Sequence, residues 1–146
     1  MSTVSVFDVA KCILEKKGPM TAMKLQKLVY YCQAWALVWD EEPLFQEKIE
    51  AWANGPVVRD LYCAHRGMFV VDKSSIARGN SSLLNQSQME TVEGVLDFYG
   101  DKTAQWLSDQ THCEGPWKDA RTGLADNERG DSEITLASLH EYYSSI

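Results

Sequence analysis

The stretch TAMKLQKLVYYCQAW, residues 21–35, decides the fold of this chain. From Leu25 onward, apolar side chains recur at offsets of 0, 3, 4, 7, 10, 11 and 14, which is the spacing of one face of an α-helix. Tyr30 and Leu37 fall on the opposite side, so the pattern predicts a central helix, capped by Thr21, that is buried on two sides. The apolar face consists of Leu25, Leu28, Val29, Cys32, Trp35, Ala36 and Trp39.

Lys24, Lys27 and Tyr31 form a separate strip along this helix, at spacings of three and four. Two uses are open for them. They can form an interaction surface, or they can serve the interior, with a lysine paired to a buried acid and the tyrosine bonded to a loop carbonyl.

Turn and capping residues predict the other helices. Gly18-Pro19 ends a first helix over 4–17, and Asn54-Gly55-Pro56 is expected to begin a third that ends at Gly67. Asn85 and Gln88 form the pattern of a capping box, in a helix that closes at Gly100. Further helices are expected to begin after Thr103 and Thr135.

Between the helices, residues 44–46 and 49–52 are short and could pair as a small β-ribbon. Residues 73–82 and 113–130 are rich in polar residues and predict irregular structure, with one turn started by Pro116. The sequence thus predicts a mainly α fold, a single compact domain over residues 1–146 with about six helices and at most a small β-ribbon.

Charge is distributed unevenly along the chain. Residues 1–73 carry nine basic and nine acidic residues, whereas residues 74–146 carry five basic and twelve acidic ones and hold the whole net charge of −7. Such a surface repels phosphate backbones, so nucleic acid is an unlikely partner, and it fits a basic protein partner or simple solubility.

The chain is expected to be cytoplasmic and to have no membrane contact. No run approaches the roughly 20 apolar residues of a membrane span, and the N-terminus lacks the pattern of a secretory signal. The four cysteines include no C-x-x-C pair and are expected to be reduced thiols.

Catalytic and metal sites find little support. Cys63, His65, His112 and Cys113 are zinc-type ligands, but adjacent residues such as His112 and Cys113 rarely share one metal. The same pair is no evidence of a cysteine nucleophile beside a base, because sequence neighbours need not form a dyad. We therefore expect no enzyme, no catalytic residue, no metal and no cofactor.

Protein binding is the remaining class. A DNA-reading helix would expose polar residues toward base edges, and the central helix is too apolar to lie in a groove. Tryptophan, tyrosine and arginine are the side chains most enriched at interface hot spots. Here the sequence offers Tyr31, Trp52, Arg59, Trp117 and Arg121, although any single tryptophan is more often a core residue.

Three motifs in order resemble those of the Panacea antitoxin domain, the SocA-like family that also includes phage-associated GepA-type proteins. They are MKLQKLVYYCQAW, PLFQEKIEAWANGPVVRDLY and YGDKTAQWLSDQTHCEGPWKDAR, and the resemblance runs from about Thr21 to Arg121. Family members usually have an aromatic residue before the Gly-Pro of the second motif, where this chain has Asn54.

The resemblance implies a mainly helical antitoxin of a toxin–antitoxin pair, which inhibits a nearby-encoded protein toxin by direct contact. The alternative is a non-antitoxin interaction module, such as a proteolytic adaptor or a phage accessory protein. The motif residues, taken with the hot-spot types, predict a partner-binding set of Lys24, Lys27, Tyr31, Trp52, Arg59, Trp117 and Arg121.

Overall fold

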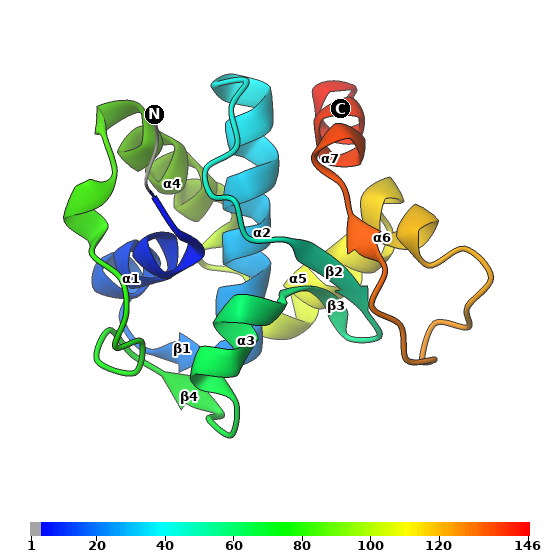
Figure 1. The fold of residues 1–146 in the computed structure, drawn as a ribbon, viewed down its shortest axis with the longest axis horizontal. Coiled ribbons are helices and arrows are strands. Elements are labelled where there is room, and N and C mark those ends of the chain that lie inside the picture. The colour runs from blue at the N-terminus through cyan, green and yellow to red at the C-terminus, as the bar shows by residue number, and fades with distance from the viewer. Residues whose placement is uncertain (1–3) are drawn as a thin grey trace.

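The computed structural model describes residues 4–146, and residues 1–3 of the expected domain lie outside the described part. The fold is mainly α with a small antiparallel sheet, as predicted (Figure 1). Within residues 4–146 the helices are α1 Val6–Lys17, α2 Ala22–Trp39, α3 Arg59–His65, α4 Gln86–Tyr99, α5 Ala104–His112, α6 Gly115–Ala120 and α7 Leu136–Ser144, with a 3₁₀ turn at Ser81–Leu83.

Helix α2 runs through the middle of the molecule, with α1 and α4 on one side and α6 and α7 on the other (Figure 1). It contacts α1, α4, α5, α7 and the strand β3 (Gly55–Val58). The Thr21 hydroxyl caps it by accepting a hydrogen bond from the N–H of Lys24, as predicted. Because neighbours surround this helix, its polar residues are buried together with its apolar ones.

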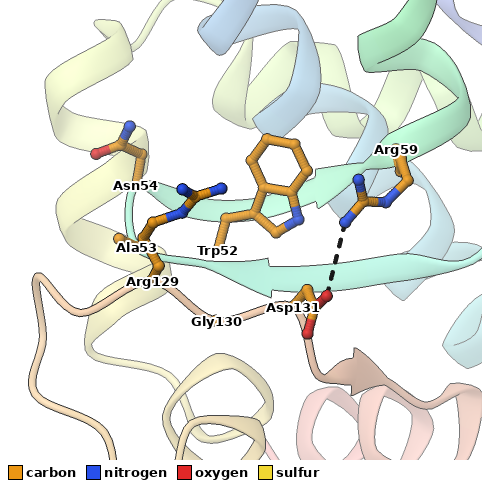
Figure 2. A pocket seen from close by; sticks show the side chains of 7 residues that line it. All are labelled: Trp52, Ala53, Asn54, Arg59, Arg129, Gly130 and Asp131. Carbon is orange, nitrogen blue, oxygen red and sulfur yellow. Dashed lines mark ion pairs between the residues drawn. The ribbon is translucent and has the colours of Figure 1, made fainter.

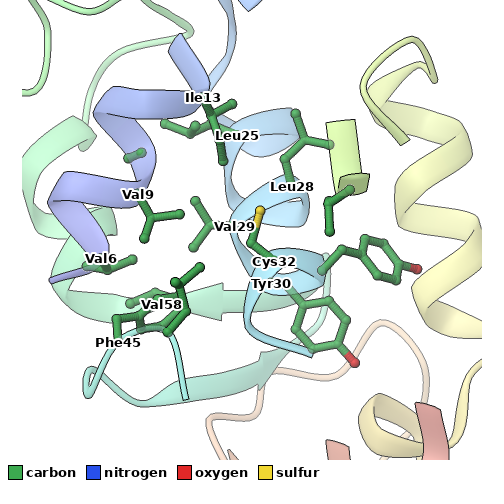
Figure 3. Close-up of a cluster of buried hydrophobic side chains, with 14 of the residues drawn as sticks. Val6, Val9, Ile13, Leu25, Leu28, Val29, Tyr30, Cys32, Phe45 and Val58 are labelled. Atoms are coloured by element: carbon green, nitrogen blue, oxygen red, sulfur yellow. The ribbon is translucent and has the colours of Figure 1, made fainter. Parts of the chain in front are cut away.

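Part of the core lies where α1 and α2 pack against β3, and Figure 3 shows this part. Val6, Val9 and Ile13 of α1 meet Leu25 and Val29 of α2 there. All five side chains are buried, so each contributes roughly 1.5–3 kcal/mol of transfer free energy. Trp39 differs from its prediction: it is 50% exposed because it stands on the last turn of α2, beside Trp35 and Gly94.

The helix boundaries confirm the capping signals. Gly18 has a φ of 81° and ends α1, and Asn85 and Gln88 form the predicted capping box of α4. The hydroxyls of Thr103 and Thr135 cap α5 and α7. The region 113–130 is less irregular than predicted, because Pro116 sits in the first turn of α6, where its missing N–H has no helical partner to lose.

The β-ribbon exists, but its partner strand was predicted wrongly. Strand β2 (Ile49–Trp52) pairs antiparallel with β3 and with β5 (Glu133–Ile134), in the order β3-β2-β5. Residues 44–46 stay outside this sheet because the side chain of Gln33 takes their backbone groups, accepting from Leu44 N at 2.7 Å and donating to the carbonyl of Phe45 at 2.8 Å. A second, two-stranded sheet pairs β1 (Met20–Thr21) with β4 (Val70–Val71).

The third helix was also predicted to begin too early. Gly55-Pro56 belongs to β3, and α3 begins only at Arg59. A two-residue turn, Ala53-Asn54, joins the strands, and Gly55 after it has a φ of 119°, which favours glycine. Pro56 has no backbone N–H to donate, and β3 tolerates this because it is an edge strand, of which one side forms no hydrogen bonds to another strand.

Candidate partner-binding site

The three sequence motifs meet at the β2–β3 hairpin. Gln26 of α2 binds both backbone groups of Val58, accepting from its N–H at 2.9 Å and donating to its carbonyl at 3.2 Å. Lys27, one residue on, packs so closely on the turn that a Cβ at position 55 would lie 2.5 Å from its Cε. The same position is 3.3 Å from the hydroxyl of Thr111, so the hairpin sits directly against α2 and α5.

Trp117 supports the hairpin from the other side. It is only 2% exposed, and its indole N–H donates to the carbonyl of Trp52 at 2.8 Å. Its ring stacks on His112 with centroids 4.0 Å apart, and the guanidinium of Arg121 lies 5.0 Å from the ring centroid. The third motif thus forms a layer that fixes the backbone of β2.

Arg121 joins the hairpin to the loop that follows α6. It is buried, and it donates to the carbonyl of Ala51 at 3.0 Å. Its other terminal nitrogen donates to the carbonyls of Ala125, Asp126 and Glu128. Because a guanidinium presents five donors in a rigid fork, one side chain can hold strand and loop together.

Lys27 carries a buried amine that is without a hydrogen-bond partner among residues 4–146. Burial lowers its pKa to about 8, because the charged form loses its hydration. The pKa of His112 is also lowered, first by burial and then by the nearby Lys27. Lys27 therefore neither pairs with an acid, as one expectation held, nor reaches the surface.

Tyr31 belongs to a separate buried network. Its hydroxyl donates to Oε1 of Glu114 at 2.8 Å, and Tyr143 donates to the same oxygen at 2.7 Å. Burial raises the pKa of Tyr31, and the adjacent Glu114 raises it further. The network thus connects α2 with α7 through Glu114, the residue that immediately precedes α6.

An open pocket of about 450 Å³ lies beside the hairpin turn (Figure 2). Its lining residues come from the turn, the start of α3 and the loop before β5, and they are Trp52, Ala53, Asn54, Arg59, Arg129, Gly130 and Asp131. In the view of Figure 2 the Trp52 indole lies between the side chains of Arg59 and Arg129.

Glu50 holds two of these side chains in place. Both of its oxygens accept from Arg59, at 2.8–3.2 Å, and Oε1 also accepts from the indole N–H of Trp52 at 2.8 Å. Burial alone would raise the pKa of Glu50, but the hydrogen bonds from Arg59 and Trp52 lower it. Arg59 lies 5.3 Å from the Trp52 ring centroid and 3.8 Å from Asp131.

Comparison with known proteins assigns the chain to a family. The model of the family described as "Antitoxin SocA-like, Panacea domain" matches residues 25–118, well over half of the chain. The chain belongs to the SocA-like Panacea family. It is also 29% identical over 140 residues to Antitoxin SocA of Caulobacter vibrioides (strain NA1000 / CB15N), with 86% of this chain and 74% of that protein covered. No solved structure matches it significantly.

The Panacea motif residues divide into a buried set and an accessible set. Lys27, Tyr31, Trp117 and Arg121 are at most 4% exposed. Lys27, Trp117 and Arg121 support the hairpin, whereas Tyr31 belongs to the network around Glu114. Trp52 is half-buried, and the side chain of Arg59 is 50% exposed. The structure thus brings Lys27, Trp52, Arg59, Trp117 and Arg121 to one hairpin and leaves only Trp52 and Arg59 within reach of a partner.

Lys24 and Tyr31 lie apart from the hairpin cluster. Lys24 is half-buried near the start of α2, and its pKa is lowered by burial and then by Lys17. Two residues escaped the sequence analysis, Arg129 at the pocket and Glu114 in the buried tyrosine network. Arg129 stands in a polar loop without any periodic or motif signal, and Glu114 resembles an ordinary surface acid until its two tyrosine donors are known.

Metal-binding clusters and membrane-spanning helices are both absent from the described part of the Panacea chain. Among residues 4–146, no group of three or more His, Cys, Asp or Glu side chains is placed to hold a metal ion. None of the helices within that range combines the length and the hydropathy that crossing a bilayer requires.

Proposed function

We propose that this chain is the antitoxin of a toxin–antitoxin pair and neutralises a protein toxin by direct binding rather than by catalysis. Membership of the SocA-like Panacea family supports this, as does the likeness to a protein named Antitoxin SocA. The structural observation that carries the proposal is the use of the motif residues. Lys27, Trp117 and Arg121 are buried against one hairpin, and that hairpin presents Trp52 and Arg59 at an open pocket.

A rigid hairpin with a fixed indole is well suited to protein recognition. Trp52 is held by its bond to Glu50 and by the edge of Tyr62, whose ring centroid lies 5.0 Å away. Little side-chain entropy is lost when such a group is covered, so more of the contact energy remains as affinity. Tryptophan and arginine are also the residues that most often dominate interface energies.

Charge and compartment are consistent with the same role. The net charge of −7 attracts a basic partner over a distance of about one Debye length, roughly 8 Å at physiological salt. We place the encounter in the cytoplasm, where the four free cysteines stay reduced.

Growth rescue tests the proposal. Each gene next to that of this chain is expressed under tight control, with and without the chain. We expect one neighbour to stop growth and co-expression to restore it. If no neighbour is toxic, or if growth is not restored although both proteins accumulate, the antitoxin function is refuted.

Two tryptophan variants make the test specific to the hairpin. Trp52→Ala is expected to weaken toxin binding by roughly 30-fold or more, the loss typical of a hot-spot side chain. Trp39→Ala is the matched control, because Trp39 is 50% exposed but lies at the end of α2. Rescue in a host that lacks its ATP-dependent proteases separates direct neutralisation, which persists there, from delivery to a protease, which does not.

A further inference from the structure

Three charged side chains line the pocket beside the hairpin: Arg59, Arg129 and Asp131. Of the two lining arginines, Arg59 alone forms an ion pair within residues 4–146, with Glu50 and Asp131. Two further cationic side chains, Lys27 and Arg121, are buried against Gly55 of the hairpin and Gly130 of the loop and do not line the pocket. Lys27 has no hydrogen-bond partner, and Arg121 bonds only backbone carbonyls.

Arg129 is the cation that is available to a ligand. It is exposed and lines the pocket, and no residue within 4–146 forms an ion pair or hydrogen bond with its side chain. The other lining cation, Arg59, already has both oxygens of Glu50. A guanidinium is most strongly bound by a carboxylate, through two parallel hydrogen bonds.

The loop that carries Arg129 is held in place by the buried side chain of Arg121. Arg121 donates to three carbonyls of residues 125–128, and its Nη1 lies 3.1 Å from where a Cβ of residue 130 would be. Gly130 therefore rests directly on the Arg121 guanidinium. The backbone position of Arg129 relative to Trp52 is therefore set before any partner binds, which lowers the entropy cost of using this residue.

From this arrangement we infer that the pocket binds an acidic side chain, glutamate or aspartate, presented by the folded surface of the partner. This rests on the proposed antitoxin function for the identity of the partner. The carboxylate meets the Arg129 guanidinium, and the methylene stem of the acid lies against the Trp52 indole. A cavity of about 450 Å³ has room for one such side chain.

The pocket and the net charge then have different roles. The acidic chain, at −7, favours encounter with a basic protein. A single acid on that protein, directed to Arg129 in the pocket, would fix the orientation in which the two dock. Charge pairs of this kind contribute more to specificity and to docking geometry than to total affinity.

Nuclear magnetic resonance on the whole chain tests the chemistry without a toxin. The probe is an acetylated, C-terminally amidated Ala-Glu-Ala peptide, and the matched probe is Ala-Gln-Ala. We expect the indole N–H of Trp52 and the Nε–H of Arg129 to shift saturably with the glutamate peptide at millimolar concentration. The glutamine peptide is expected to shift them at least about fivefold less.

Two variants assign the effect to Arg129. Arg129→Gln is expected to abolish the shift of the Trp52 indole signal, and Arg66→Gln is expected to leave it unchanged, since Arg66 is an exposed arginine at the end of α3. Equal shifts with both peptides, or no shift at all, overturn the proposal. A larger shift with a peptide whose only carboxylate is its free C-terminus also overturns it, in favour of a chain-end ligand.

A second arm uses the toxin found by growth rescue. Arg129→Glu is expected to lower toxin affinity tenfold or more, and one reversal of an acidic residue on the toxin is expected to restore it. If no toxin exists, the proposed antitoxin function fails while the peptide experiment still decides the pocket chemistry. If rescue succeeds but the peptide experiment fails, the antitoxin function stands and the carboxylate pocket does not.

Discussion

The hydroxyl of Tyr31 donates a 2.8 Å hydrogen bond to Oε1 of Glu114, a carboxylate that is only 4% exposed. The same oxygen accepts from Tyr143, and the other oxygen accepts from Gln110 at 3.1 Å. No lysine or arginine within residues 4–146 forms an ion pair with Glu114. The buried carboxylate of Glu114, between α2 and α7, is therefore stabilised by neutral hydrogen-bond donors alone.

Replacing Tyr31 by phenylalanine should show how much the hydrogen bond to Glu114 contributes to stability. The ring packing is retained, but one donor to a buried carboxylate is lost, so the free energy of unfolding is expected to fall by about 1–3 kcal/mol. Urea denaturation measures the change. Tyr62→Phe is the control, because the Tyr62 hydroxyl has no hydrogen bond within residues 4–146 and its loss should cost less than about 0.5 kcal/mol. Equal losses in the two variants would contradict the role of Glu114.

Gly55→Ala is expected to be much more damaging than an alanine at another left-handed glycine. Gly55 combines a φ of 119° with a Cβ position only 2.5 Å from Lys27 Cε, whereas Gly67 has a φ of 88° and nothing within 4 Å. Gly67→Ala should therefore cost about 1 kcal/mol from backbone strain alone. Gly55→Ala adds overpacking and should cost roughly 2–4 kcal/mol. Thermal unfolding of both variants checks this, and similar values would mean that Lys27 moves aside freely.

Lys27 should make stability depend on pH in the alkaline range. Its pKa is lowered from 10.5 to about 8 by burial, so the unfolded chain binds more protons than the folded chain between these values. The contribution of Lys27 to the free energy of unfolding is thus least favourable below pH 8 and improves as the pH rises toward 10.5. Lys27→Met removes this dependence and is expected to stabilise the protein at pH 7.

The difference between the two proteins isolates Lys27 from other titrating groups. Burial raises the pKa values of Cys32 and Tyr30, and these groups destabilise the fold as the pH rises in both proteins alike. The advantage of Lys27→Met over the natural chain should shrink by roughly 2 kcal/mol between pH 7 and pH 9.5. Urea denaturation at the two pH values measures it. A constant difference would show that Lys27 finds a partner or solvent in solution.

The sequence predicted the features that depend on contacts between neighbouring residues better than those that depend on contacts between residues far apart in the chain. Caps such as Thr21, Asn85 and Thr103 bond within their own first turn, so local sequence predicts them well. Gly55-Pro56 fits a helix start and an edge strand equally, and the strand is selected by residues far away in sequence, since Gln26 bonds Val58 and Arg121 bonds Ala51.

The candidate site shows the same division. Trp52 and Arg59 were predicted from residue type, and the structure places both at the pocket. The burial of Lys27 could not be predicted, because a lysine on an amphipathic pattern is ordinarily exposed and here the hairpin covers it. Arg129 reaches the pocket only because a buried arginine eight residues earlier folds its loop back, which no local pattern indicates.

Arg121 is expected to control the mobility of the loop that carries Arg129. Lysine at position 121 keeps the charge but cannot reproduce the fork that bonds Ala51 and the carbonyls of residues 125–128. Losing these bonds lowers the free energy of local opening, and proteolysis follows the population of the open form. Trypsin should therefore cut after Arg129 roughly tenfold faster or more in Arg121→Lys than in the natural chain.

Arg66→Lys serves as the control for this experiment, because Arg66 is exposed at the end of α3 and holds no loop. It should leave the cleavage rate after Arg129 unchanged. Urea denaturation of Arg121→Lys distinguishes a local effect from a global one: cleavage that rises in proportion to global unfolding would reflect lost stability alone. An unchanged rate after Arg129 would mean that contacts other than Arg121 fix the loop, and the preorganised position of Arg129 beside Trp52 would lose its physical basis.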